Sequence, residues 1–254
     1  MRLTALPLIG LIVLAFLLQS CDKEVENFET APLSDYVSLQ PGKYFIYRTD
    51  STVFTDLGRT EEVHTYQEKD VVDTIITDNL NRTSYRIYRY LRDTAGTQPW
   101  VAAGTYFITP LPTTIEVVEN NLRTVRLTLP VTQGTTWKGN RYLPTEPYSG
   151  QYSFNNDDNM ADWDFTIDST DQTVTLNGNT YNEVIVVTSA DESINVPITD
   201  ASSYASRTLS VDQYAKSIGL IYQEYTMWEY QPNPGGPSPY KIGFGVKRTL
   251  LEHN

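Results

Sequence analysis

Residues 155–164 carry the densest group of oxygen ligands in the sequence. They read Asn-Asn-Asp-Asp-Asn-Met-Ala-Asp-Trp-Asp. Carboxylate and amide oxygens suit Ca²⁺, which accepts about six to eight of them in a loose geometry. The spacing differs from that of an EF-hand loop, which also needs a glycine and a terminal bidentate glutamate. A solvated loop before a strand is the simpler interpretation, and a calcium site is the alternative. Its candidate ligands are Asp157, Asp158, Asp162 and Asp164.

The sequence contains no catalytic motif of the common hydrolases. Asp93-Thr94-Ala95-Gly96 looks like an aspartic-protease signature, but its order differs and no second Asp loop is present to share a proton. The two histidines are His64, within a strand pattern, and His253, near the end of the sequence. No Gly-x-Ser-x-Gly elbow presents a nucleophile to either of them, and two histidines are too few for a histidine-based metal site. We expect residues 93–96 to form a turn between strands.

A carboxylate pair of the glycosidase kind needs only two acids, which can lie far apart in the sequence. The chain has 31 Asp and Glu residues, and their spacing does not distinguish any two of them. Carbohydrate-active catalysis through a carboxylate pair is therefore an alternative without assigned residues.

Aromatic residues make up 12% of the chain, and several of them gather in one expected strand. Tyr222, Tyr225, Trp228 and Tyr230 lie beside residues 231–239, which are rich in Pro and Gly. Aromatic rings flanked by acids and amides can stack on sugar rings, so these four residues are candidates for a glycan-binding face. Tyr and Trp are also favoured in strands and at half-buried edges, and packing is the simpler interpretation.

Four Asp-Ser or Asp-Thr segments resemble the O-glycosylation signal of exported Bacteroidota proteins. Such pairs also favour turns, which are frequent in this sequence. If the resemblance holds, the modified hydroxyls are those of Ser51, Thr74, Thr94 and Ser169.

The charge balance excludes one class of partner. The chain has 31 acidic and 19 basic residues, a formal net charge of −12. Nucleic-acid binding depends on a basic surface that releases counterions from the phosphates. We therefore expect no nucleic-acid partner.

The N-terminus has the features of a cleaved export signal. An apolar run from Leu3 to Leu18 follows Arg2, and it is shorter than the roughly 20 residues that a membrane-spanning helix needs. The run ends in Leu18-Gln19-Ser20-Cys21, which resembles the lipobox of bacterial lipoproteins. The resemblance implies cleavage after residue 20 and lipidation of the Cys21 thiol. An ordinary secretory signal followed by a chance cysteine is the alternative.

Cleavage and lipidation at this place would leave a chain without thiols. Removal of residues 1–20 takes away Arg2 and no acidic residue, so the formal net charge changes from −12 to −13. Because Cys21 is the only cysteine, the folded part would have no disulfide, thiolate metal site or cysteine nucleophile. Its stability must come from a hydrophobic core, and the chain is long enough to bury one.

Short runs of alternating apolar and polar residues begin near residue 41 and are rich in Tyr, Thr, Val and Ile. This period of two predicts half-buried strands. Residues 21–40, which start acidic, are expected to form a flexible tether. The expected strands are 43–54, 62–76, 83–92, 100–109, 114–119, 123–129, 161–167, 173–176, 180–189, 220–230 and 241–250.

Asn177-Gly178 is the clearest turn signal, because a two-residue type I′ turn needs positive φ at both positions. We expect a hairpin here, with Val184 and Val186 on one face of its second strand and Ile185 and Val187 on the other.

Three segments fit no strand pattern. Residues 200–217 have the composition of a helical turn. Residues 130–151 and 231–239 are too rich in Pro and Gly for a regular element and are expected to be loops. The loop near residues 130–160 is the only plausible boundary inside the expected domain.

Four blocks of the chain resemble Bacteroidota membrane lipoproteins of unassigned activity: Cys21–Glu24, Gly42–Tyr47, Leu176–Tyr181 and Tyr214–Glu224. In that group, acidic residues after the lipidated cysteine act as a signal for display on the outer face of the outer membrane.

The signal for display is incomplete in this sequence, so the orientation stays open. Lys23-Glu24 is similar to its beginning, whereas Val25 stands where a second acid is usual. An anchor that faces the periplasm is the alternative. In enterobacterial lipoproteins an Asp in the place of Asp22 signals retention in the inner membrane.

Together these patterns predict an all-β, antiparallel domain over residues 41–254, as a strongly curved sheet or an incomplete barrel or sandwich with long loops. We expect a lipid-anchored cell-envelope protein of the outer membrane that acts as a non-enzymatic binding or structural module. A glycan or an apolar small molecule is its expected ligand. An enzyme should show two close carboxyls with perturbed pKa values in a deep cleft, whereas a binding module should show an aromatic platform or an apolar cavity inside the sheet.

Overall fold

A computed structural model describes residues 30–152, 154–156, 158–236 and 238–254. The expected signal peptide, Cys21 and residues 22–29 of the expected tether lie outside these residues, as does Asp157. Within the described part of the chain, no helix is long and apolar enough to cross a membrane.

Strands make up nearly all of the regular structure. They are β1 (Tyr44–Thr55), β2 (Thr60–Thr77), β3 (Thr83–Asp93), β4 (Val101–Pro110), β5 (Thr114–Glu119), β6 (Leu122–Thr128), β7 (Thr136–Lys138), β8 (Asp164–Leu176), β9 (Asn179–Ile194), β10 (Ala205–Ala215), β11 (Gly219–Gln231) and β12 (Tyr240–His253). The short helices are η1 (Leu33–Tyr36), η2 (Asp56–Gly58), α2 (Ser149–Tyr152) and η3 (Met160–Asp162).

The twelve strands form one antiparallel sheet in the order β6-β5-β4-β3-β2-β1-β12-β11-β10-β9-β8-β7. The first and last strands pair with each other, so the two edges, β6 and β7, come from the middle of the chain. The sheet curls until these edges approach one another. The Val125 N–H donates to the Gly139 carbonyl at 2.8 Å, and the Trp137 indole donates to the Val125 carbonyl at 2.8 Å. The predicted curved, all-β architecture is confirmed as a nearly closed barrel.

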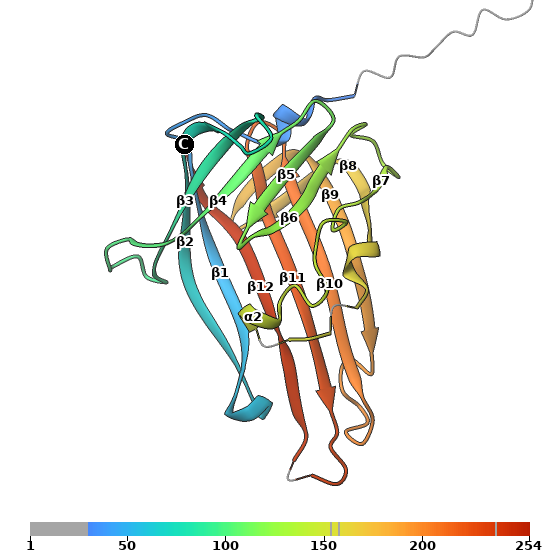
Figure 1. The fold of residues 1–254 in the computed structure, drawn as a ribbon. Coiled ribbons are helices and arrows are strands. Elements are labelled where there is room, and N and C mark those ends of the chain that lie inside the picture. The colour runs from blue at the N-terminus through green and yellow to red at the C-terminus, as the bar shows by residue number, and fades with distance from the viewer. Residues whose placement is uncertain (1–29, 153, 157, 237) are drawn as a thin grey trace, which may run out of the picture.

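Figure 1 shows how the barrel is built. The long strands β9 to β12 form a tall wall, and β3 to β6 cross in front of its upper part. The segment between β7 and β8, which carries α2, crosses lower down. It buries Leu143, Phe154 and Met160 against Met227 and Phe244 of β11 and β12. The described residues of the segment 130–160 therefore pack against the barrel wall and do not mark a boundary inside the domain. They include the short strand β7, which was not expected.

Strand β10 corrects the expectation of a helical turn in residues 200–217. The buried residues Thr208, Ser210 and Asp212 alternate with half-buried residues along this strand. Apolar Leu209 and Val211 alternate with these three residues, so the sequence has a period of two, but the polar residues are the buried ones. The expectation failed because the interior that β10 faces is itself partly polar.

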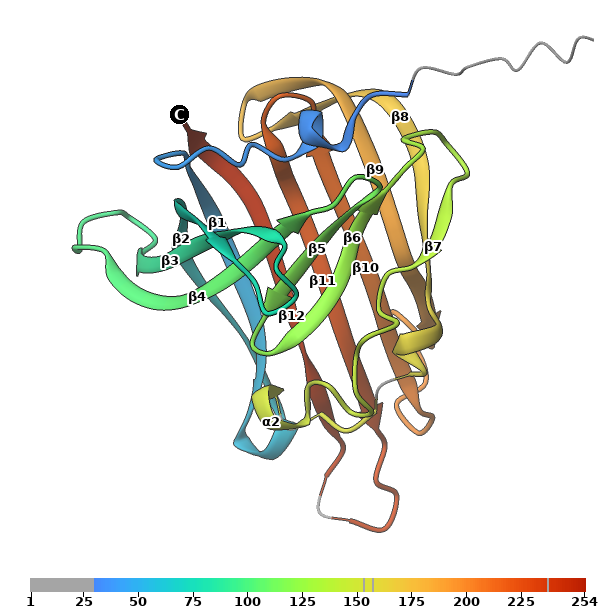
Figure 2. The same cartoon turned by 45° about the horizontal axis from the view of Figure 1, so that its top comes forward.

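Residues 31–40, here called the strap, cross the upper end of the barrel (Figure 2). Leu33 and Tyr36 of η1 are buried in the core, and the Ser217 N–H donates to the Asp35 carbonyl at 2.5 Å. The tether, expected to run to residue 40, therefore ends before Leu33.

The hairpin at Asn177-Gly178 is confirmed. Both residues have positive φ, 50° and 83°. Ile185 and Val187 pack in one core cluster and Val184 packs in another, as the predicted alternation requires. The strand before the turn is one continuous element, β8, where two strands were expected. Its pairing with β9 contains three register irregularities, which interrupt the period of two.

Replacement of Gly178 by Val should lower the free energy of unfolding by roughly 1–3 kcal/mol, the usual size of backbone strain at one position. A side chain at this position would meet open space, so the cost comes from the positive φ, which a β-branched residue adopts only with strain. Asn177→Gly is the control and should cost much less. Urea unfolding measures both changes, and an unchanged midpoint for Gly178→Val would contradict the expected turn geometry.

Candidate ligand-binding cavity

Two adjoining cavities occupy the interior of the barrel. The apolar cavity, of about 110 Å³, lies next to the strap, which contributes Val37 and Leu39 to its wall. The tyrosine cavity, of about 460 Å³, lies further from the strap. The aliphatic walls of the apolar cavity include Val72, Ile87, Ile108, Ile115 and Leu127. The aromatic walls of the tyrosine cavity are Tyr66, Tyr148, Tyr152, Tyr225 and Phe244.

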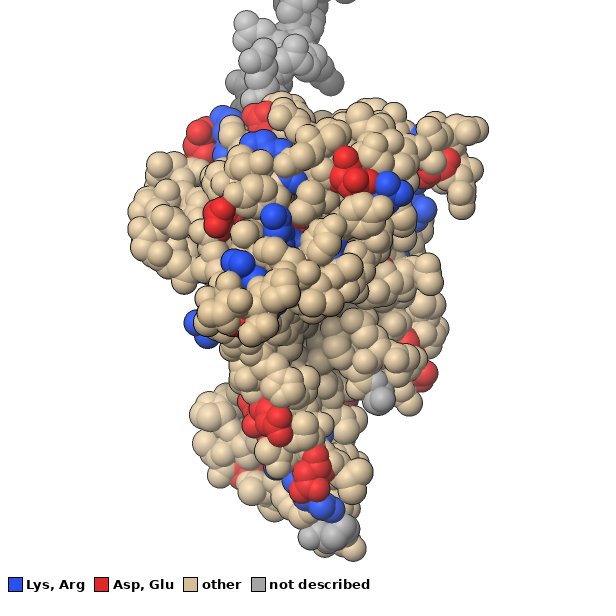
Figure 3. Space-filling model, turned by 90° about the vertical axis from the view of Figure 1, so that its left-hand side faces the viewer, with Lys and Arg blue, Asp and Glu red and all other residues tan. Residues whose placement is uncertain are grey.

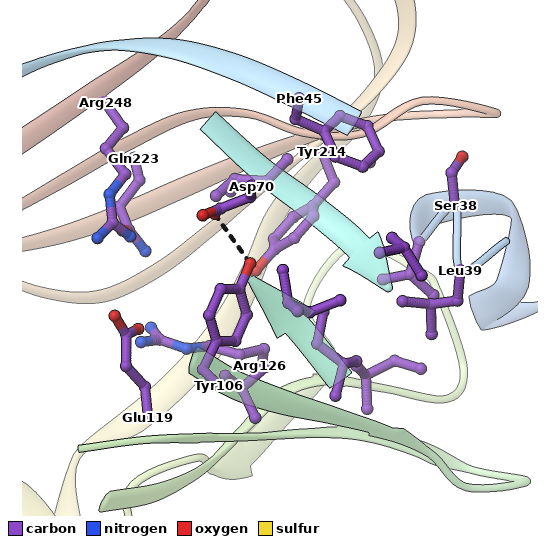
Figure 4. A pocket seen from close by; sticks show the side chains of 18 of the residues that line it. Ser38, Leu39, Phe45, Asp70, Tyr106, Glu119, Arg126, Tyr214, Gln223 and Arg248 are labelled. Carbon is purple, nitrogen blue, oxygen red and sulfur yellow. Dashed lines mark hydrogen bonds between the residues drawn. The ribbon is translucent and has the colours of Figure 1, made fainter. Parts of the chain in front are cut away.

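Seven residues line both cavities and are here called the belt. They are Arg89, Tyr106, Val117, Glu119, Arg126, Gln223 and Arg248. Six strands contribute to the belt, namely β3, β4, β5, β6, β11 and β12. Figure 4 shows the labelled belt residues on the side of the apolar cavity away from Ser38 and Leu39 of the strap.

Strand alternation places Arg89 and Glu119 of the belt inside, whereas Arg126 stands at a register irregularity between β5 and β6. On β3, Arg89 stands two residues after Ile87, and on β5, Glu119 stands two residues after Val117. All four line the apolar cavity, because residues two apart in a strand point to the same face. The side chains of Arg89 and Glu119 are therefore inside the barrel as a direct result of strand register.

Arg89 is the centre of the largest interior network. Its Nε lies 2.8 Å from Asp70 Oδ1 and 3.2 Å from Glu68 Oε1, and its Nη1 donates to Glu119. Burial by itself lowers the pKa of Arg89, but the charges of Asp70, Glu68 and Glu119 outweigh it and hold the pKa well above its ordinary value. Burial likewise raises the pKa of Glu119, but nearby arginines, above all Arg89, outweigh it and hold the pKa below its ordinary value.

Glu68 is held mainly by charge. Its Oε1 lies 3.0 Å from Arg248 Nε, an ion-pair distance, yet the two atoms are not aligned as a hydrogen bond. Burial raises the pKa of Glu68 above its ordinary value, against the opposing charges of Arg248 and Arg89. The two carboxyls of the tyrosine cavity, Glu68 and Glu119, therefore have pKa values shifted in opposite directions.

Arg126 has fewer partners than the other two arginines of the belt. Its Nη1 lies 3.5 Å from Asp212 Oδ2. Asp212 already accepts hydrogen bonds from the Tyr214 hydroxyl at 3.0 Å and from Gln223 Nε2 at 2.8 Å. The Gln223 carbonyl in turn accepts from Arg248 Nη1 at 2.8 Å.

The interior tyrosines stay protonated and can donate hydrogen bonds. Burial raises the pKa of Tyr106 well above its ordinary value and raises the pKa of Tyr152 to about 12. The Tyr106 hydroxyl donates to Asp70 Oδ2 at 2.9 Å (Figure 4). The Tyr152 ring, from α2, stacks on Phe244 with centroids 4.0 Å apart. The segment before β8 thus supplies part of the aromatic wall.

The candidate calcium ligands do not form a recognisable site. Asp157 lies outside the described residues. Asp164 pairs with Lys138 at 3.0 Å, and Asp162 Oδ2 accepts from Asn159 at 3.2 Å. Asp158, Asp162 and Asp164 are all exposed. Among the described residues, no three His, Cys, Asp or Glu side chains are grouped so that they could hold a metal ion. Calcium binding stays a prediction.

The four aromatic candidates on β11 are separated. Tyr225 lines the tyrosine cavity, whereas Tyr222 and Trp228 line neither cavity. The Trp228 ring lies 4.5 Å from Lys241 Nζ. The Tyr230 side chain is buried, and its hydroxyl donates to a backbone carbonyl at 2.9 Å. These residues do not form one platform, because strand alternation turns Tyr225 away from the other three and Tyr230 is buried.

The candidate glycosylation sites differ in access. Ser51, Thr74 and Ser169 lie within strands and are half-buried, and the Ser51 hydroxyl is 2.8 Å from that of Tyr66. Thr94 is exposed after β3. Modification of these hydroxyls stays a prediction.

Two smaller expectations concern residues outside the cavities. The turn at residues 93–96 is confirmed by a hydrogen bond from the Gly96 N–H to the Asp93 carbonyl at 3.0 Å. His64 lies on β2, is exposed and contacts Glu62 at 2.9 Å.

On the face shown in Figure 3, Lys and Arg side chains are interspersed with Asp and Glu and form no extended basic surface.

None of the seven belt residues stands in a catalytic or ligand-binding motif that the sequence singles out. A signal was nevertheless present, because Arg89, Glu119 and Arg248 each occupy a position where the period of two calls for an apolar residue. A charged residue at such a position indicates either an exposed strand face or a polar interior. Only the closure of the sheet shows which of the two applies.

A scan against protein-family models and a search of curated proteins each find no match. Among solved structures, the chain is similar to the crystal structure of a Bacteroides fragilis protein. That protein is described as having a YmcC-like fold, and its export is inferred. The two chains share 11% sequence identity with a TM-score of 0.40, and the alignment covers 86% of this chain and 98% of that one.

Proposed function

We propose that this chain is a lipid-anchored protein of the bacterial outer membrane that binds a small organic molecule inside its barrel. The observation that carries the proposal is the pair of cavities joined at the belt. The tyrosine cavity, of about 460 Å³, falls within the range of roughly 300–1,000 Å³ that is typical of ligand sites. The resemblance of Leu18–Cys21 to a lipobox supports the anchor.

The lining of the cavities supports binding of a molecule with both apolar and polar parts. Ligand sites combine apolar or aromatic walls with a few convergent polar groups that orient the ligand. Here aliphatic and aromatic walls lie on the two sides of the belt, which supplies guanidinium, amide, carboxylate and hydroxyl groups. An apolar cavity inside the curved sheet is also the feature expected of a binding module.

A carbohydrate-active enzyme is the second candidate function. It is favoured by Glu68 and Glu119, which line one cavity and have pKa values shifted in opposite directions, as an acid and a base require. Both carboxylates contact Arg89, which reduces their ability to exchange protons with a substrate. Release of new reducing ends from an oligosaccharide would favour this candidate over simple binding.

Filling the junction of the cavities should abolish ligand binding. Val117 belongs to the belt, whereas its neighbour Val118 lines neither cavity. We expect Val117→Trp to weaken binding of the neutral fluorescent probe N-phenyl-1-naphthylamine by at least about tenfold, or about 1.4 kcal/mol, because the indole occupies space that the probe needs. Val118→Trp is the matched control and should bind the probe as the parent chain does.

Fluorescence titration of the full chain carrying Cys21→Ser, which has no acyl chains of its own, measures this binding. Equal affinities for the two tryptophan variants, or no binding by the parent chain, would show that the interior is not a ligand site.

A further inference from the structure

We propose that the belt binds the acidic group of an organic monoanion and that Arg126 is the residue that contacts it. This inference rests on the proposed binding function and adds the chemical class of the ligand. The body of the ligand is an aromatic or alicyclic ring system, which lies in the tyrosine cavity.

The first observation is the charge that the two cavities share. The belt contains three arginines but only one carboxylate, Glu119. The other interior carboxylates lie to either side, since Glu68 lines only the tyrosine cavity, Asp70 lines only the apolar cavity, and Asp212 lines neither. Asp70, Glu119 and Glu68 pair closely with Arg89 and Arg248, so Arg126 is the belt arginine whose charge is least compensated.

The second observation is that Arg126 lacks hydrogen-bond acceptors. Arg89 and Arg248 donate to Asp70, Glu119 and Gln223. For Arg126 the structure shows one acidic contact, Asp212 at 3.5 Å, and no hydrogen bond to any described residue. The side chain is half-buried and lines both cavities, so its unpaired N–H groups are open to a ligand. A carboxylate or sulfonate would supply acceptors, because its oxygens match the planar fork of arginine.

The position of Arg126 favours access by a ligand. The side chain is 26% exposed although it projects into the barrel, and it lines both cavities. The remaining exposure therefore faces the space in which a ligand would lie. No described side chain has to leave Arg126 before an anion can bind.

The surroundings of Arg126 also limit the charge and the shape of the ligand. A second negative charge would approach Glu119 on the belt or Glu68 in the tyrosine cavity, and like charges repel strongly at low dielectric. A monoanion avoids both carboxylates. Its ring body fits between the rings of Tyr148, Tyr152 and Tyr225, which offer faces and edges for aromatic packing. The apolar cavity, of about 110 Å³, is smaller than the tyrosine cavity, of about 460 Å³, so we place the ring system in the tyrosine cavity.

Two probes with one ring system test the inference. N-Phenyl-1-naphthylamine is neutral, and 1-anilinonaphthalene-8-sulfonate adds one sulfonate to the same rings. On the full Cys21→Ser chain we expect the sulfonate probe to bind at least about tenfold more tightly than the neutral probe, the effect of one charge-assisted hydrogen bond. Arg126→Gln should remove this preference and leave the affinity for the neutral probe unchanged.

Arg123→Gln is the matched control for the loss of one positive charge. Arg123 lies on the same strand, lines neither cavity and pairs with Glu116. The ratio of the two affinities should therefore stay at the parent value in this variant.

Asp212→Asn gives a second test, with an effect of opposite sign. It removes the acidic contact of Arg126, so binding of the sulfonate probe should tighten severalfold while binding of the neutral probe is unchanged. General damage to the fold would weaken both probes. The variant therefore keeps the inference testable if Arg126→Gln fails to fold.

The outcomes separate this inference from the proposed function. Equal affinities of the parent chain for the two probes would overturn the inference alone, provided that Val117→Trp still abolishes binding of the neutral probe. An unchanged preference in Arg126→Gln and Asp212→Asn would also overturn it. Absence of binding by both probes would overturn the inference together with the proposed function.

Discussion

Replacement of Arg89 by Met is expected to lower the free energy of unfolding by about 3–5 kcal/mol at neutral pH, the usual result of breaking a buried ion pair. The guanidinium is the shared partner of Glu68, Asp70 and Glu119. Without it, three carboxylates face each other inside the barrel, and Arg248 is the remaining arginine in contact with Glu68. Burial of unpaired charge then opposes folding.

The loss caused by Arg89→Met should shrink as the pH falls from 7 towards 5. In the parent chain the charge of Arg89 helps to hold the pKa of Glu119 below its ordinary value, whereas the pKa of Glu68 is already raised by burial. Without Arg89, burial raises the pKa values of the carboxyls in the folded state above those of the unfolded chain. The folded variant then binds more protons than the unfolded variant, so its stability rises as the pH falls.

Urea unfolding at several pH values measures both effects. Arg92→Met is the matched control, because Arg92 lies on the same strand and donates to the neutral Gln67. It should cost no more than about 1 kcal/mol and show no such dependence on pH. A loss below about 1 kcal/mol for Arg89→Met, or a loss that grows at low pH, would contradict the role assigned to the network.

Replacement of Cys21 by Ser is expected to move the whole population of the protein from membranes to the soluble fraction. Each buried methylene of an acyl chain contributes about 0.8 kcal/mol to membrane binding, so several chains hold essentially permanently. Serine has no thiol to receive the lipid. Fractionation of the native host, followed by detergent phase separation, measures the change.

Ser20→Ala is the control for the membrane experiment, because alanine keeps the small residue that the lipobox resemblance requires before Cys21. This variant should stay with the membranes. Recovery of the Cys21→Ser chain in the detergent phase would refute the lipid anchor.

Local patterns predicted most of the strands. Strand β5 begins and ends at the expected residues, 114 and 119, and β1 to β4, β6, β11 and β12 lie within a few residues of their expected bounds. These strands keep the period of two, and this pattern depends only on residues that are close to one another in the sequence. The prediction failed for β10, where Ser210 and Asp212 occupy buried positions, and for β7, which has three residues and is too short for a period to be seen.

The residues that line both cavities were not singled out from the sequence. Arg126 and Asp212 are 86 positions apart in the sequence, and their contact depends on where the curling of the sheet places β6 relative to β10. The arrangement of the aromatic candidates also depended on the fold, since Tyr225 and Trp228 are three positions apart along β11 and point to opposite faces. The types and spacing of residues therefore indicated candidate site residues, but they did not show which of these residues contact one another in the fold.

By itself, the sequence determined the strand content and the Asn177-Gly178 turn, because each depends on local backbone preference. Only the tertiary structure decided that charged residues on several strands face a closed interior. The reason is physical: a strand specifies which residues share a face, whereas the closure of the sheet decides whether that face meets water or other strands. That closure makes Arg89 and Arg126 part of the lining of the two interior cavities instead of ordinary surface charges.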